Sequence, residues 1–100
     1  MKKFTNLMGA VRGPVRVDCE SPFSCSFVAK INDEIIVAVL IGDLGRALWR
    51  SMHIHDLFRV DGYVMPGSMC GYPNYRNVFA IENITMLQDA VSGGNLNAWG

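Results

Sequence analysis

The fold is decided by residues 38–62, which read A-V-L-I-G-D-L-G-R-A-L-W-R-S-M-H-I-H-D-L-F-R-V-D-G. This stretch begins inside an apolar strand that we expect from Glu34 to Ile41, and Gly42 breaks that strand. Asp43 occupies the position of a helix N-cap, because apolar residues recur at helical spacing from Leu44 to Met52. The stretch therefore predicts a strand, a short helix and a returning strand.

The returning strand, L-F-R-V-D-G-Y-V-M, alternates between two faces with the period of a half-buried strand. One face carries Phe58, Val60, Gly62 and Val64, and the other carries Arg59, Asp61, Tyr63 and Met65. We expect the first of these faces to line a core.

The beginning of the chain alternates in the same way, from Thr5 to Val17. Gly9 is expected to let this strand bend sharply, as the closure of a barrel requires. Gly13-Pro14 interrupts regular pairing, because proline has no amide hydrogen to donate. The segment predicts one curved strand or two short ones.

A hairpin is expected next, because Asn32-Asp33 tolerates turn geometry between a strand from Ser24 to Ile31 and the strand from Glu34 to Ile41. The second strand of this hairpin, E-I-I-V-A-V-L-I, is apolar on both faces, so both faces must be covered. We expect the core to cover one face and a subunit interface to cover the other.

The last part of the domain is a loop and a strand. Pro66 to Tyr75 contains two glycines and two prolines and predicts a loop, and Asn77 to Leu87 predicts a strand with a bulge at Asn83. Three strands, one short helix and two strands are typical of the five-stranded oligonucleotide-binding barrel, the OB-fold. We therefore predict an all-β OB-fold over residues 1–88, with its helix between strands 3 and 4, and a flexible tail over 89–100 that includes Trp99.

The composition fits one small domain, because 100 residues of which half are apolar bury a single thin core. Such a core favours self-association, and we expect a homo-oligomer, a dimer or a tetramer. The formal net charge is zero, which removes the argument for nucleic-acid binding from a strongly basic chain. Cations nevertheless outnumber Asp18 and Glu20 over residues 1–30.

The cysteines and the apolar runs indicate a compartment. Cys19, Cys25 and Cys70 are odd in number and lack zinc-site spacing, so we expect reduced thiols in a cytoplasmic protein. The longest apolar run, Ile35 to Ile41, is far shorter than a membrane span, and no charged-then-apolar leader opens the chain. We expect no membrane partner.

Residues 38–62 also resemble the bacterial single-stranded DNA-binding protein family, including its primosomal replication protein N branch. In that family a strand ends in two apolar residues and a glycine, a leucine follows two residues later, and a strand V-x-V-x-G returns. Here Gly42, Leu44 and Phe58-Arg59-Val60-Asp61-Gly62 occupy those places. The segment N-L-M-G-A-V near the start of the chain resembles the family's first strand, and the segment I-E-N-I-T-M-L resembles its last strand. The likeness therefore covers roughly residues 5–88.

The sequence departs from this family at several positions. Ile35 and Met69 stand near two places where the family has aromatic residues that face nucleic acid, and His55 replaces the glycine before the fourth strand. The tail ends N-A-W-G in place of an acidic tip, so recruitment of replication proteins through such a tip is not implied.

Single strands are bound by cations that follow the phosphates and by flat aromatic faces that stack on bases. The candidate cations are Arg12, Arg16, Lys30, Arg59 and Arg76, and the candidate stacking residues are Tyr63 on the outward strand face and Tyr72 and Tyr75 in the loop. The alternative for each is ordinary barrel surface. With so few cations, we expect modest affinity and a shallow dependence on salt.

Metal and catalytic sites have weaker support. His53 and His55 lie two residues apart without a third ligand nearby, and Asp18 and Glu20 lack a nucleophile or an orienting group, which favours solvated loop charges. No nucleotide fingerprint or phosphate-binding glycine loop is present in the sequence. We predict no metal, no cofactor and no enzymatic activity.

The sequence thus supports two hypotheses. The first is a non-catalytic protein that binds single-stranded DNA, with RNA as an open alternative, accessory to DNA replication, recombination or transfer. The second is an OB-fold interaction module of a replication or primosome assembly that contacts replication proteins and binds DNA weakly or not at all. Zero net charge and the missing aromatic residues favour the second.

Overall fold

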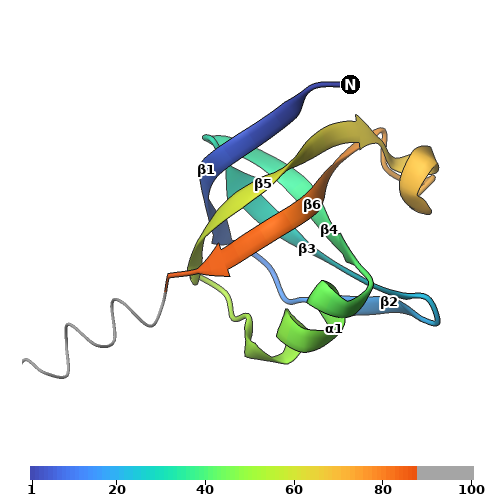
Figure 1. Cartoon of the computed structure of the whole chain (residues 1–100), viewed down its shortest axis with the longest axis horizontal. Coiled ribbons are helices and arrows are strands. Elements are labelled where there is room, and N and C mark those ends of the chain that lie inside the picture. The colour runs from blue at the N-terminus through green and yellow to red at the C-terminus, as the bar shows by residue number, and fades with distance from the viewer. Residues whose placement is uncertain (88–100) are drawn as a thin grey trace, which may run out of the picture.

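The computed structural model describes residues 1–87, and these form a small β-barrel (Figure 1). The strands are β1 (Lys3–Val11), β2 (Arg16–Glu20), β3 (Phe23–Ile31), β4 (Glu34–Ile41), β5 (Leu57–Pro66) and β6 (Asn77–Met86). The helix α1 (Asp43–Leu48) and a 3-10 turn (Trp49–Ser51) connect β4 to β5, and a second 3-10 turn (Gly67–Cys70) follows β5. The predicted tail over 89–100, Trp99 and the domain boundary near Gln88 lie outside the described residues.

The first predicted strand is two strands, β1 and β2, because pairing stops around Gly13-Pro14. The sheet has the order β1-β5-β6-β4-β3-β2, and an additional pairing of β1 with β3 closes it into a barrel. All neighbours are antiparallel except β4 and β6, which pair in parallel at Ala38–Phe79 and Val39–Ala80. With β1 and β2 counted as one interrupted strand, this is the predicted five-stranded OB-fold.

The interior of the barrel contains Phe58 and Val60 of the predicted inward face of β5, whereas Val64, predicted on the same face, is 39% exposed near the end of the strand. The buried residues of the interior are Val11, Phe23, Cys25, Phe27, Ala29, Ile31, Ala38, Leu40, Met52, Phe58, Val60 and Phe79. Gly9 is the residue at which β1 begins to pair with β3 while it still pairs with β5, and a separate register irregularity of β1 lies between Phe4 and Leu7, where Asn6 has a φ of 56°. A Cβ atom on Gly9 would overlap the ring of Phe58, so this glycine also makes room for the core.

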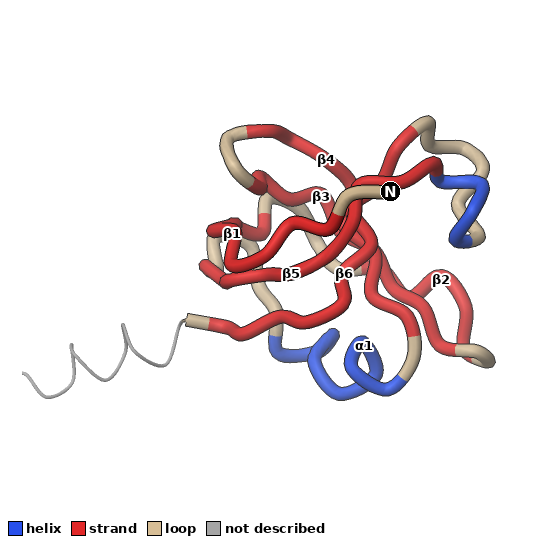
Figure 2. The backbone as a smooth tube through the Cα atoms, turned by 45° about the horizontal axis from the view of Figure 1, so that its top comes forward, coloured by secondary structure: helices blue, strands red, loops and turns tan. Residues whose placement is uncertain are grey.

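The hairpin and the helix follow the sequence closely. Asn32 and Asp33 adopt φ values of 53° and 68°, the left-handed geometry of a tight two-residue turn. Gly42, with a φ of 85°, is the N-cap of α1, so Asp43 is the first helical residue and not the cap. Figure 2 shows α1 at one end of the barrel, where it contacts β3 and β4. His55 has a φ of 82° where the family has glycine.

The outer face of β4 is covered in a way that the sequence did not indicate. The β5–β6 loop, residues 67–76, folds over this face and forms a second apolar cluster of Val39, Tyr72 and Val78. The expected subunit interface is therefore not required at the centre of β4, because the chain itself covers that part. Ile35 and Ile41, at the two ends of the strand, remain 60% and 49% exposed.

The last strand contains the predicted irregularity. Asp61 pairs with Asn83 and Gly62 pairs with Ile81, so Glu82 is the extra residue of a bulge beside Asn83. Among the described residues, no helix has the length and apolar character of a membrane-spanning segment.

Candidate nucleic-acid interface

The outer face of β3 and β4 carries a groove that we call the β3–β4 groove. It is lined by Gly13, Pro14, Arg16, Ser26, Phe27, Val28, Val37 and Tyr75. Val28 and Val37 are directly paired across β3 and β4 and form an apolar floor. The link between β1 and β2 supplies one wall and the β5–β6 loop supplies the other. OB-folds bind oligonucleotides on the face of their second and third strands, which here are β3 and β4.

Arg16 and Tyr75 are the two predicted binding residues that meet in this groove. Arg16 is exposed on β2, opposite Ser26 of β3, and its outward direction follows from that pairing. Tyr75 is half-buried, and its backbone amide donates to the carbonyl of Tyr72 at 3.1 Å. A cation and an aromatic ring on opposite walls of an apolar floor can hold a phosphate and a base of one strand.

Three further predicted cations are exposed on elements that border the groove. Arg12 follows β1, and its amide donates to the carbonyl of Val28 at 2.8 Å. Lys30 lies on β3 with its amine 4.0 Å from the carboxylate of Asp33. Arg76 follows Tyr75 directly at the end of the β5–β6 loop. These residues place exposed positive charge on the elements around the groove.

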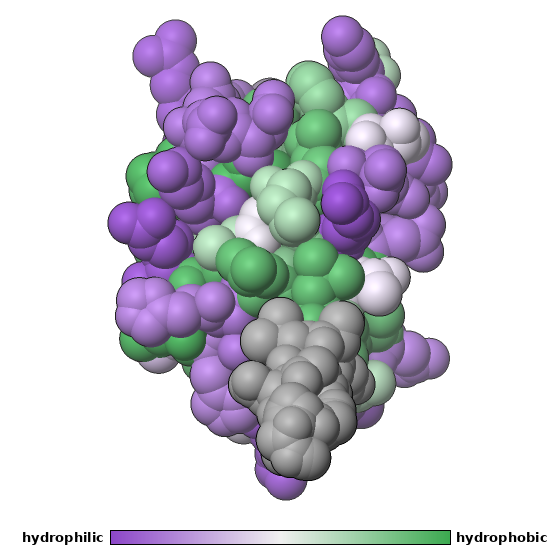
Figure 3. All heavy atoms as spheres, turned by 90° about the vertical axis from the view of Figure 1, so that its left-hand side faces the viewer, coloured by the Kyte–Doolittle hydropathy of each residue, from purple (hydrophilic) through white to green (hydrophobic). Residues whose placement is uncertain are grey.

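Arg59 and Tyr63 lie on β5, which does not neighbour β3 or β4 in the sheet. Arg59 is paired with Met8 of the neighbouring strand β1, and it lines a different hollow together with Asn6 and Asp61. Figure 3 shows the side of the barrel that lies on the left in Figure 1, where apolar side chains gather at the centre with polar ones around them. The structure thus does not bring Arg59 and Tyr63 into the β3–β4 groove.

Tyr72 occupies a different place from the one expected of a stacking residue. Its side chain is only 8% exposed, because the ring packs against Val39 and Val78. Its hydroxyl donates to the Oδ2 atom of Asp18 at 2.6 Å. Burial in the first place, and this hydrogen bond in addition, raise the pKa of Tyr72 to about 12. A ring held in this way has no face free for a base, which corrects the prediction for Tyr72.

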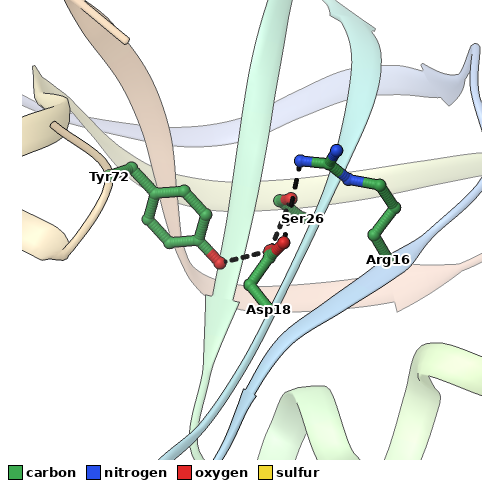
Figure 4. Close-up of polar contacts among 4 residues, drawn as sticks. All are labelled: Arg16, Asp18, Ser26 and Tyr72. Carbon is green, nitrogen blue, oxygen red and sulfur yellow. Dashed lines mark hydrogen bonds and ion pairs between the residues drawn. The ribbon is translucent and has the colours of Figure 1, made fainter. Parts of the chain in front are cut away.

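Asp18 is a site residue that the sequence reasoning missed when it assigned the carboxylate to a solvated loop. It lies on β2, and its Oδ2 atom also accepts a hydrogen bond from the Ser26 hydroxyl at 2.7 Å. Its Oδ1 atom is 3.6 Å from the Arg16 guanidinium (Figure 4). The available signal was the two-residue spacing from Arg16, which places both side chains on one face of a strand, although the register of β2 shifts between Val17 and Cys19.

A second charged cluster lies on β1, β5 and β6, where Lys3 forms an ion pair with Glu82, and this contact raises the pKa of Lys3. Cys19, Cys25 and Cys70 are free, and burial together with the charge of Asp18 raises the pKa of Cys25 to about 11. His53 and Asp56 form a local contact of 3.7 Å at the start of β5. Within residues 1–87, no group of three His, Cys, Asp or Glu side chains is placed to hold a metal ion.

Comparison with solved structures identifies the kind of barrel. The SSB domain of a protein from Synechococcus sp. superposes with a TM-score of 0.61 at 12% identity, over 84% of this chain and 93% of that chain. The N-terminal domain of a PriB protein from Thermoanaerobacter tencongensis, a dimeric structure, gives a TM-score of 0.60 at 11% identity over the same shares of the two chains. PriB from Ralstonia solanacearum gives 0.52 at 12% identity, over 86% of this chain and 98% of that chain.

These likenesses establish the fold. The chain has an OB-fold like that of SSB domains and PriB, which confirms the resemblance read from residues 38–62. Neither a protein-family model nor a curated protein matches the sequence.

Proposed function

We propose that this protein binds single-stranded DNA without catalysis, as an accessory factor in DNA replication, recombination or transfer. The observation that carries the proposal is the β3–β4 groove, which places Arg16 and Tyr75 around an apolar floor. The groove lies on the face that OB-folds use for oligonucleotides. The SSB and PriB likeness of the barrel supports the same function.

Binding in this groove divides between two kinds of contact. The ring of Tyr75 stacks on a base, an interaction that contributes about 1–3 kcal/mol and tolerates any base. Arg16 neutralises a phosphate beside it, and Arg12, Lys30 and Arg76 follow the backbone on either side. Because Val28 and Val37 contribute only apolar contact, we expect no sequence preference and modest affinity.

We also propose that the protein is cytoplasmic and that it self-associates, with a dimer as the main expectation. Ile35 and Ile41 leave apolar surface exposed at both ends of β4, where a second chain would bury it. The dimeric PriB domain of similar fold supports this proposal. Light scattering coupled to size-exclusion chromatography tests it, and a monomer at tens of micromolar would contradict it.

The second candidate function is an OB-fold module that contacts proteins of a replication or primosome assembly. The burial of Tyr72 favours it, because the groove then retains one stacking residue, Tyr75. The net charge of zero favours it as well.

Fluorescence anisotropy of labelled oligo-dT, measured at two salt concentrations, separates the two functions. We expect binding at low salt that weakens at high salt, and a clear loss of affinity in Tyr75→Ala. Tyr63→Ala is the matched control, because it removes a tyrosine ring that does not line the groove. Absence of binding at low salt up to tens of micromolar protein would favour the interaction module, and labelled oligo-rU in the same assay would distinguish RNA from DNA.

A further inference from the structure

The carboxylate of Asp18 joins three elements of the barrel surface. It accepts hydrogen bonds from Ser26 on β3 and from Tyr72 on the β5–β6 loop, and it contacts Arg16 on its own strand. Figure 4 shows that the Tyr72 side chain reaches Asp18 across β4. Hydrogen bonds to a charged acceptor are stronger than neutral ones, so this contact fixes the loop to the barrel.

Within the β5–β6 loop, backbone hydrogen bonds link Tyr72 to Tyr75. The amide of Tyr72 donates to the carbonyl of Gly67 at 2.7 Å, and the amide of Tyr75 donates to the carbonyl of Tyr72 at 3.1 Å. A Cβ atom on Gly67 would overlap the carbonyl oxygens of both tyrosines, so the loop closes tightly around this glycine. The two tyrosine rings lie with their centroids 6.4 Å apart.

We infer that Asp18 and Tyr72 are positioning residues that hold Tyr75 in place as the stacking wall of the β3–β4 groove. Neither residue contacts nucleic acid in this role. The inference rests on the proposed function, since the groove is the site that they complete. Fixing the ring before binding removes an ordering cost that a free loop would otherwise add to each binding event.

The direction in which Asp18→Ala changes the affinity for DNA distinguishes a positioning role of Asp18 from a purely electrostatic one. A carboxylate beside a phosphate-binding groove repels phosphates, so its removal by itself strengthens binding. Positioning predicts the opposite, because Asp18→Ala frees the loop that carries Tyr75. Asp18→Ala therefore weakens binding even though it removes one negative charge and leaves Arg16 without its carboxylate partner.

The experiment compares Tyr72→Phe and Asp18→Ala with matched controls in the oligo-dT anisotropy assay. Tyr63→Phe removes the same hydroxyl outside the groove, and Asp43→Ala removes the same carboxylate from the exposed first turn of α1. We expect Kd to rise about 3- to 10-fold in Tyr72→Phe and in Asp18→Ala, a loss no larger than that of one base stack. Both controls stay within about twofold of the unsubstituted chain.

A second readout uses the protein without DNA. Nuclear Overhauser effects should connect the Tyr75 ring with the methyl groups of Val37 and Val39 in the unsubstituted chain, and they should weaken in Tyr72→Phe while the barrel core keeps its chemical shifts. Wild-type affinity with unchanged effects in Tyr72→Phe would overturn the inference, as would tighter binding by Asp18→Ala. If the unsubstituted chain does not bind oligo-dT, the proposed function fails, and the Overhauser effects alone decide whether the contact positions Tyr75.

Discussion

The two apolar clusters of this barrel differ in what they determine. The interior cluster takes residues from β1, β3, β4, β5 and β6, so it joins segments along nearly the whole described chain. The outer cluster has three buried members, Val39, Tyr72 and Val78, and one of them is a tyrosine with a polar partner. The interior cluster determines the fold, whereas the outer cluster determines how much of the outer face of β4 is exposed.

This difference explains how one barrel can serve several purposes. Replacing an apolar side chain in the interior destabilises the whole fold, because interiors are densely packed. The outer cluster instead depends on a loop and one hydrogen bond, so we expect its loss to expose the outer face of β4 and to leave the barrel folded. The four predictions below test this separation.

Phe58→Ala should produce the largest effect. Phe58 is fully buried and meets Phe27 edge to face at 6.1 Å between ring centroids. Removal of a buried phenyl ring costs about 3–5 kcal/mol of unfolding free energy, a large part of the stability of a domain this size. Urea unfolding followed by circular dichroism measures the loss. Leu57→Ala, one residue away and partly exposed, is the control, and an equal loss there would contradict the separation of interior from surface.

The second-largest effect should come from the titration of Tyr72 in the outer cluster, which makes the unfolding free energy depend on pH. The pKa of Tyr72 rises from 10.0 to about 12 in the folded protein, so the folded state holds the phenolic proton more tightly than the unfolded state does. The stabilisation is complete below pH 10 and is lost as the pH rises through 12. Its size is at most about 2–3 kcal/mol, since one pKa unit corresponds to about 1.4 kcal/mol.

Tyr72→Phe isolates this effect from the titration of other groups. The difference in unfolding free energy between the two proteins should change between pH 10 and pH 12 and stay constant from pH 7 to pH 9. Urea unfolding at each pH measures it. A constant difference across the whole range would show that Tyr72 titrates in the same way in the folded and unfolded states.

The interior cluster is also the part of the molecule that could be predicted from the sequence. Alternation from Phe58 to Gly62, the break at Gly42 and the turn at Asn32-Asp33 are local signals, and each of them indicates one element. The order of those elements then leaves few folds to choose from. The bulge at Asn6 and the close contact of Gly9 with Phe58 have no local signal, because both depend on strands that are distant in sequence.

The candidate site was predictable only in its residue types. Arg16 and Tyr75 were selected as a cation and an aromatic residue, and the fold brought them to one groove. Asp18 and Tyr72 were misjudged because their partners are 54 residues apart, a contact that no local pattern encodes. A tyrosine in a glycine-rich and proline-rich loop is equally compatible with an exposed platform and with a buried anchor.

Val39→Ala should loosen the outer cluster without changing the barrel. Two methyl groups are removed from a fully buried position, which costs about 1–2 kcal/mol of unfolding free energy. The expected loss is smaller than for Phe58→Ala, and the amide chemical shifts of β1 and β5 should remain unchanged. Urea unfolding and a two-dimensional NMR spectrum measure both. Widespread shifts in β1 would show that the two clusters are coupled.

Arg16→Ala should have the smallest energetic effect, and it tests which face of the barrel binds DNA. Arg16 lines the β3–β4 groove, while Arg59 lines a hollow on the other side of the sheet. Loss of one phosphate contact reduces the slope of log Kd against log salt by about 0.7 for a single strand. We expect this reduction in Arg16→Ala and an unchanged slope in Arg59→Ala, both measured by anisotropy with oligo-dT. The opposite result would move the DNA path to the face formed by β1, β5 and β6, and the outer cluster would then have no part in binding.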